Sequence, residues 1–79
     1  MYKTKDFTLA CVMYAEGFKL IDTEKEDGCR TIFFVFNIVD KEELKTKIIN
    51  DFVNQSCYVN VKKFTWATKK LRQEMDKYK

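Results

Sequence analysis

Thiol and imidazole side chains are the usual ligands of zinc in proteins, and this chain of 79 residues has few of them. It contains three cysteines, Cys11, Cys29 and Cys57, and no histidine. Their spacings of 18 and 28 residues include no Cys-x-x-Cys pair, which is the arrangement that most zinc sites use. We therefore expect no metal and no cofactor, and we interpret the cysteines as buried structural thiols.

Nucleophilic catalysis of the familiar kinds requires a serine or cysteine with a base beside it. Without histidine, the Ser/His/Asp and Cys/His arrangements are excluded, and Ser56 is the only serine. Acidic residues cluster at Asp22, Glu24, Glu26 and Asp27, either as a catalytic carboxylate pair or as charges that keep a strand edge solvated. We favour the solvated edge because the cluster surrounds a turn. The two glycines are isolated and form no phosphate-binding loop, so we expect no enzymatic activity.

Positive charge is concentrated in the second half of the chain, although the net charge is only +3. Residues 1–40 carry a net −2 and residues 41–79 a net +5. A helix predicted from Val61 to about Lys77 places Phe64, Ala67, Leu71, Met75 and Tyr78 on one apolar, core-facing stripe. The opposite stripe consists of Lys62, Trp66, Lys69, Lys70, Gln73 and Lys77. Trp66 thus lies among basic residues and not among apolar ones.

Three interpretations of this outer stripe remain open. Lysines that neutralise phosphates and an indole that stacks on an unpaired base would bind nucleic acid, single-stranded or without sequence specificity. Alternatively, Trp66 anchors a protein partner, as expected of an adaptor or inhibitor. Thirdly, the stripe only keeps the domain soluble, with Trp66 covered by Met1 to Lys3 or by lysine stems. Only Arg30 and Arg72 could supply bidentate base recognition, which disfavours sequence-specific binding.

The length predicts one small domain over residues 1–79, and the order of the helices and strands predicted along it makes the fold α+β. Hydrophobic residues make up 46% of the chain, which is enough for a core and argues against disorder. No run approaches the roughly 18–20 uncharged apolar residues of a membrane span. With no membrane segment and no recognisable export signal, we expect a cytoplasmic protein with reduced thiols.

The first predicted helix runs from about Lys5 to Glu16, with Thr4 or Asp6 as its N-cap and Gly17 as the residue that ends it. It is apolar nearly all round, so we expect it at the centre of the core.

A β-hairpin is predicted next, from strands at Phe18 to Lys25 and Cys29 to Asn37 around a two-residue Asp27-Gly28 turn. This register pairs Asp22 with Phe33. We favour a helix that covers the sheet face bearing Phe34 and Phe36; if this face lacks a covering helix, these rings would form a docking or homodimer surface.

A second helix is predicted after an Asp40/Glu43 capping box, with Val39 and Leu44 as a hydrophobic staple, and it ends at Asn54-Gln55-Ser56. A short third strand could follow at Cys57 to Val59.

Asn60 is the predicted N-cap of the last helix, with Val59 and Phe64 as its hydrophobic staple. The resulting fold packs helices on a small antiparallel sheet.

Four segments of the chain also resemble a known family. They are Tyr2-x-Thr4-x-Asp6-Phe7-x-Leu9-Ala10, Gly17-Phe18-Lys19-Leu20, Asp40-Lys41-Glu42-Glu43-Leu44 and Val59-Asn60-x-Lys62-Lys63-Phe64. Together they resemble a small domain of unknown function that is frequent in bacterial phages and mobile elements, over nearly the whole chain. The resemblance implies a stand-alone domain in a mobile-element setting. It supplies no active residues to carry over to this chain.

Overall fold

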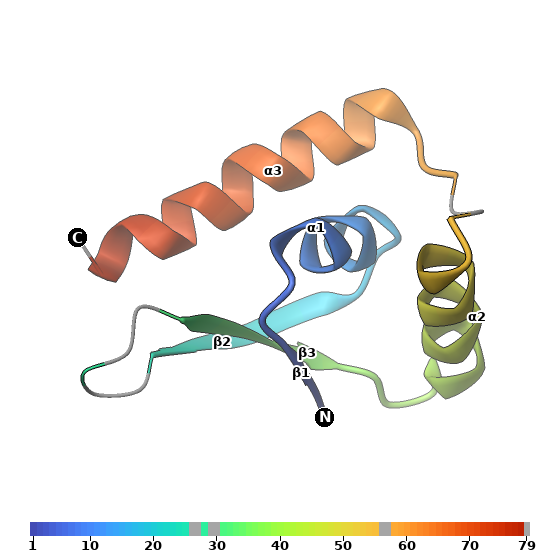
Figure 1. Ribbon diagram of the computed structural model, residues 1–79, viewed down its shortest axis with the longest axis horizontal. Helices are drawn as coiled ribbons and strands as arrows, with labels where there is room; N and C mark the ends of the chain where they lie inside the picture. The colour runs from blue at the N-terminus through green and yellow to red at the C-terminus, as the bar shows by residue number, and fades with distance from the viewer. Residues whose placement is uncertain (26–27, 29–30, 56–57, 79) are drawn as a thin grey trace.

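The computed structural model describes residues 1–25, 28, 31–55 and 58–78 and shows an α+β fold (Figure 1). The elements follow one another as β1 (Tyr2–Thr4), α1 (Phe7–Ala15), β2 (Lys19–Lys25), β3 (Ile32–Asn37), α2 (Glu42–Val53), α3 (Val61–Met75) and the 3-10 turn η1 (Asp76–Tyr78). The three strands form an antiparallel sheet in the order β1-β3-β2. Helices α1 and α3 lie on one side of this sheet and α2 lies at its end (Figure 1).

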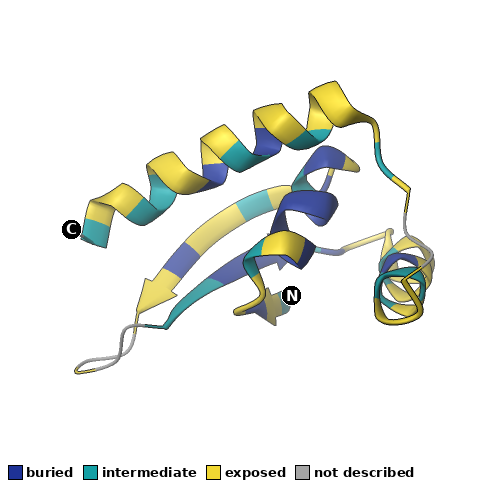
Figure 2. Cartoon of the chain, turned by 45° about the horizontal axis from the view of Figure 1, so that its top comes forward, coloured by how far each residue is buried: buried dark blue, intermediate teal, exposed yellow. Residues whose placement is uncertain are grey.

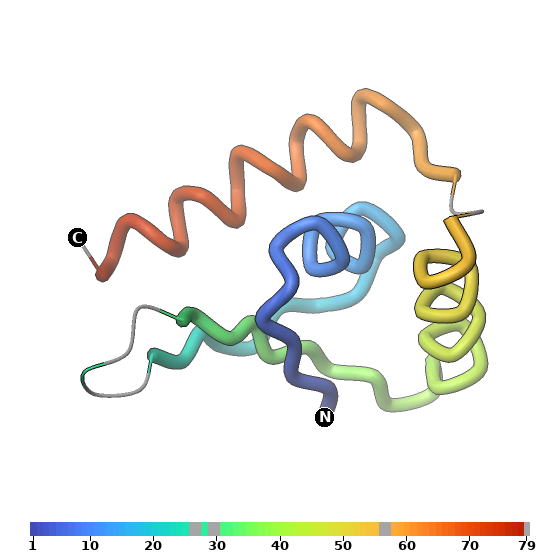
Figure 3. Tube along the Cα trace, in the orientation of Figure 1, coloured from blue at the N-terminus to red at the C-terminus, as the bar shows by residue number. Residues whose placement is uncertain are grey.

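The third strand of the sheet is β1, at the start of the chain. It pairs with β3 through Tyr2–Phe36, Lys3–Val35 and Thr4–Phe34. The prediction of a strand at Cys57 to Val59 is wrong for Tyr58 and Val59, which belong to no strand, and Cys57 lies outside the described residues. In the trace of Figure 3 the N-terminal segment passes β3 before it enters α1, and its pairing with β3 makes β3 the central strand.

Strand pairing at the N-terminus also moves the start of α1. Because Thr4 belongs to β1, the helix begins at Phe7 and not at Lys5, and its N-cap is Asp6, the second of the two predicted candidates. The Asp6 side chain accepts a hydrogen bond from the Leu9 amide at 3.0 Å. Thr4 instead accepts one from the Asp6 amide at 3.1 Å.

The helix α1 ends as the sequence predicts, at a glycine with positive φ. Gly17 has φ +96°, and its amide donates to the Tyr14 carbonyl at 3.2 Å. The next amide, that of Phe18, donates to the Met13 carbonyl at 3.1 Å. This pair of bonds is the Schellman motif, and it turns the chain directly from α1 into β2.

The β2–β3 hairpin is confirmed, but its predicted register is wrong by two residues from Asp22 to Lys25 and by one residue at Lys19 and Leu20. Asp22 lies opposite Val35, not Phe33, and the last pair is Lys25–Ile32. The pairing also shifts by one position between Leu20 and Asp22, where a β-bulge occurs at Ile21. Of the predicted turn, Asp27 lies outside the described residues and Gly28 has φ +74°.

Phe34 and Phe36 are 1% and 0% exposed, so a helix covers this face, as the favoured interpretation predicts, and the alternative of an uncovered docking surface is wrong. Phe7 of α1 packs on Phe34 with ring centroids 6.0 Å apart. Helix α1 lies between α3 and the sheet (Figure 1), and most of its residues are buried. As the burial colouring in Figure 2 shows, the buried residues gather on α1 and on the sides of β3 and α3 near it. The expectation that this helix is the centre of the core is confirmed.

Helix α2 begins at Glu42, one residue later than an N-cap at Asp40 predicts. Asp40 has φ +64°, a left-handed conformation, whereas an N-cap residue requires extended backbone. The position preceding the helix is Lys41, which makes no side-chain capping bond and instead donates from Nζ to the Gly17 carbonyl at 3.0 Å. The Asp40 capping box and its staple are therefore wrong, and Val39 is largely exposed. The end of α2 is as predicted, with Asn54 as C-cap.

Candidate nucleic-acid interface

Helix α3 presents the two stripes that the sequence predicts. Its N-cap is Asn60, whose side chain accepts a hydrogen bond from the Lys63 amide at 3.1 Å. On the core side Ala67 and Leu71 are fully buried, while Phe64 and Met75 are half-buried against the same core. The six predicted site residues are exposed: Lys62, Trp66, Lys69, Lys70, Gln73 and Lys77.

Trp66 has an aromatic neighbour that the sequence analysis missed. Its ring contact within the described part of the chain is with Tyr14 of α1, at a centroid distance of 4.9 Å and an interplanar angle of 30°. Of the residues considered as a cover for Trp66, Tyr2 and Lys3 belong instead to β1, which pairs with β3. The indole remains 49% exposed. Trp66 is thus supported by a second ring and still open to a ligand.

The two rings form one wall of a groove with a volume of about 560 Å³. Its sides are α3, the C-terminal end of α1 and the first residues of β2. The buried side chains of Phe18 and Leu71 lie at its base, together with the half-buried Leu20. The groove therefore combines an apolar base with an aromatic wall.

Charged and polar side chains surround this apolar base. Lys19 at the start of β2 and Lys70 of α3 line the groove, as do Gln73 and Glu74. Lys77 lies 2.5 Å from Oε2 of Glu74, and the hydrogen bond to that carboxylate raises the pKa of the Lys77 ammonium. The acidic residue in the groove is thereby paired, so the groove favours an anionic ligand.

The groove divides the predicted site residues into two groups. Trp66, Lys70 and Gln73 line it, and Lys77 reaches it through Glu74. Lys62 and Lys69 do not line it and extend the basic surface along the outside of α3. The sequence analysis missed Tyr14, Lys19 and Glu74. A signal for Tyr14 was present, since it is a residue with a polar end in an otherwise apolar helix.

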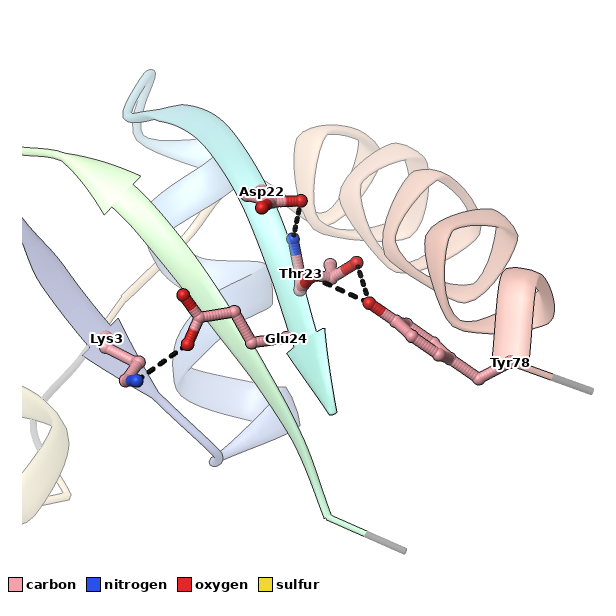
Figure 4. Close-up of polar contacts among 5 residues, drawn as sticks. All are labelled: Lys3, Asp22, Thr23, Glu24 and Tyr78. Carbon is pink, nitrogen blue, oxygen red and sulfur yellow. Dashed lines mark hydrogen bonds and ion pairs between the residues drawn. The ribbon is translucent and has the colours of Figure 1, made fainter. Parts of the chain in front are cut away.

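The free edge of β2 is closed to an added strand at Thr23. The Thr23 amide donates a hydrogen bond to Oδ1 of Asp22 at 2.8 Å (Figure 4). The Thr23 carbonyl accepts a hydrogen bond from the Tyr78 hydroxyl at 2.7 Å. The bulge at Ile21 interrupts the same edge. Occupied backbone groups and bulges are features that protect edge strands from pairing with other chains.

The described residues include no group of three or more His, Cys, Asp or Glu side chains that could hold a metal ion. Cys11 is fully buried, and burial raises the pKa of its thiol, which agrees with a structural role. Glu24 forms an exposed ion pair with Lys3 at 2.6 Å, while Glu26, Asp27, Cys29, Ser56 and Cys57 lie outside the described residues. No helix in the part of the chain that the structure describes is long and apolar enough to span a membrane.

Comparison with known families and proteins gives a single assignment. A family model described as a domain of unknown function, DUF5659, matches residues 1–78. The comparisons with curated proteins and with solved structures found no match. The match extends from β1 to η1 and so includes every element that forms the groove. The chain belongs to the DUF5659 family, whose function is unknown.

Proposed function

We propose that this protein is a non-enzymatic module that binds single-stranded nucleic acid in the groove between α3, α1 and β2. The observation that carries the proposal is the half-exposed Trp66, which is backed by Tyr14 and has Lys70 and Lys19 in the same groove. An aromatic platform beside basic residues is the usual construction of sites that bind single strands without strong sequence preference.

In this proposal the indole stacks on one unpaired base. The contact with Tyr14 limits the movement of Trp66, so less side-chain freedom is lost when a base stacks on it. Lys70 and Lys19 contact the phosphates on either side of that base, and Lys62 and Lys69 continue the basic path along α3. Base stacking of this kind contributes about 1–3 kcal/mol per base.

The setting that we propose is the cytoplasm of a bacterium that carries a phage or mobile element. The cytoplasm is supported by the buried Cys11 thiol, which suits a reducing compartment. The mobile-element setting is supported by the family resemblance described above.

A protein partner is the competing proposal, for an adaptor or inhibitor or for a homodimer. The closed edge of β2 at Thr23 disfavours one common mode of peptide binding, in which the peptide adds a strand to a sheet. The paired Glu74 and the lysines of the groove favour a ligand rich in negative charge, which a nucleic acid supplies at every residue.

The proposal can be tested by fluorescence, because Trp66 is the only tryptophan of the chain. A single-stranded oligothymidylate of about 12 nucleotides should quench its emission on binding. Affinity should fall as salt rises from about 50 to about 200 mM, with a slope of about −0.7 per phosphate neutralised. With labelled oligonucleotide and anisotropy as readout, Trp66→Ala should weaken binding about tenfold or more, and Lys70→Gln should reduce the salt slope by about 0.7.

Matched controls lie outside the groove. Tyr58→Ala removes a ring that is 92% exposed but not part of the groove, and Lys47→Gln removes an exposed lysine of α2. Neither control should change affinity or salt slope. Absence of binding at the lowest salt, or equal loss from Trp66→Ala and Tyr58→Ala, would contradict the proposal. Capture of one protein after nuclease treatment, lost in Trp66→Ala, would support the adaptor instead.

A further inference from the structure

We infer that the groove selects guanine as the base that stacks on Trp66. The inference rests on the proposed function and adds to it a preference at one nucleotide position. It comes from the two polar residues that line the groove beyond the aromatic wall, Gln73 and Glu74.

The placement of these residues follows from the geometry of α3. Gln73 and Glu74 follow Trp66 by seven and eight residues, which is two helical turns or about 11 Å along the axis. They line the same groove as the indole, so a base that stacks on Trp66 in the groove can direct its hydrogen-bonding edge towards them. Among the groove residues, these two are the ones with side-chain hydrogen-bond acceptors other than the ring hydroxyl of Tyr14.

The chemistry of Glu74 distinguishes between bases. An ionised carboxylate only accepts hydrogen bonds, and its two oxygens offer about four acceptor positions. Lys77 occupies one position on Oε2, at 2.5 Å. Guanine is the base whose pairing edge carries two adjacent donor groups, N1–H and the N2 amino group. These match the two oxygens of one carboxylate.

Gln73 completes the match, because guanine O6 lies beside N1 and an amide NH₂ group can donate to it. The other bases fit less well. Adenine and cytosine present a ring nitrogen acceptor next to their amino group, and that lone pair would face the carboxylate. The N3–H of uracil or thymine lies between two carbonyl oxygens, which the carboxylate repels.

The test uses oligothymidylates of about 12 nucleotides with one central dG, dA or dC. These single substitutions avoid the self-association of guanine runs. The dG oligonucleotide should bind about tenfold tighter than all-dT, which corresponds to one good bidentate contact, while dA and dC stay within about twofold of all-dT. Inosine lacks the N2 amino group, so an oligonucleotide with central inosine should lose most of the gain.

Variants of the protein separate recognition from charge. Glu74→Gln should abolish the preference for dG, so that the dG, dA and dC oligonucleotides bind this variant within about twofold of one another. Lys77→Gln removes the ion pair but keeps the carboxylate, so it should weaken every oligonucleotide alike and keep the preference. Circular dichroism confirms that each variant is folded.

The outcomes distinguish this inference from the proposed function. Equal affinity for all four central bases, or a dG preference that survives Glu74→Gln, overturns the guanine inference while the binding function stands. No binding of any oligonucleotide overturns both.

Discussion

Tyr78 shows how one hydroxyl group joins the end of the chain to the sheet. It donates a hydrogen bond to the Thr23 carbonyl at 2.7 Å, and its oxygen also lies 2.9 Å from the Thr23 hydroxyl, as Figure 4 shows. A phenol has one proton, so the Thr23 hydroxyl must be the donor in the second bond. The contact spans 55 residues of sequence and holds η1 beside β2.

Replacing this hydroxyl tests its contribution directly. Tyr78→Phe keeps the ring but leaves the Thr23 carbonyl without its donor, so the free energy of unfolding should fall by about 1 kcal/mol. Urea denaturation followed by circular dichroism measures the change. Tyr58→Phe is the matched control, because Tyr58 is almost fully exposed and should show no loss. Equal stability of Tyr78→Phe and the parent would show that the hydroxyl is not needed there.

At the scale of the elements, two of the α-helices begin with a side-chain cap and the third does not. Asp6 and Asn60 both have extended backbone and accept a bond from an amide three residues on. Helix α2 has no such bond at its start, because the preceding turn places Asp40 in the left-handed region. Local sequence marks Asp40 as a cap as clearly as Asn60, yet the path of the chain after β3 decides against it.

The contribution of the α3 cap can be measured. Asn60→Ala removes the side-chain acceptor of the Lys63 amide, and the free energy of unfolding should fall by about 1 kcal/mol. Asn50→Ala is the matched control: Asn50 is exposed inside α2, where alanine is the better helix former, so it should cause no loss. Thermal or urea unfolding of both variants gives the comparison. A larger loss in Asn50→Ala than in Asn60→Ala would contradict this account.

At the scale of the whole molecule, stability depends on α1 lying between α3 and the sheet. A helix with buried residues on nearly every side needs cover from two directions, and Leu71, Ala67 and β3 provide it. A chain of 79 residues has a total stability of only about 4–12 kcal/mol, so each large buried side chain in this layer matters.

Leu71→Ala should therefore be the most damaging of the substitutions considered. Leu71 is fully buried, and its truncation leaves a cavity that costs about 2–5 kcal/mol. Leu44→Ala makes the same chemical change on α2, where the side chain is 37% exposed, and should cost about 1 kcal/mol or less. Chemical denaturation separates the two variants. Similar losses at both positions would show that the core does not centre on α1 and α3.

The sequence alone determined the features that depend on short-range patterns. The spacing of Phe64, Ala67 and Leu71 identified the buried side of α3, since a helix brings residues three and four apart onto one face. Gly17 marked the end of α1 because glycine adopts positive φ without strain. The same spacing placed Trp66 opposite the apolar stripe but left open whether other residues cover it.

Tertiary structure decided what depends on segments far apart in the sequence. From Asp22 to Lys25 the pairing differs from the predicted one by two residues, which keeps each of these side chains on its own face. Alternation could therefore not reveal that Asp22 lies opposite Val35. Tyr2–Thr4 is too short to show a strand pattern and is defined by its pairing with β3. The groove, too, arises only when α1, β2 and α3 bring Tyr14, Lys19 and Trp66 together.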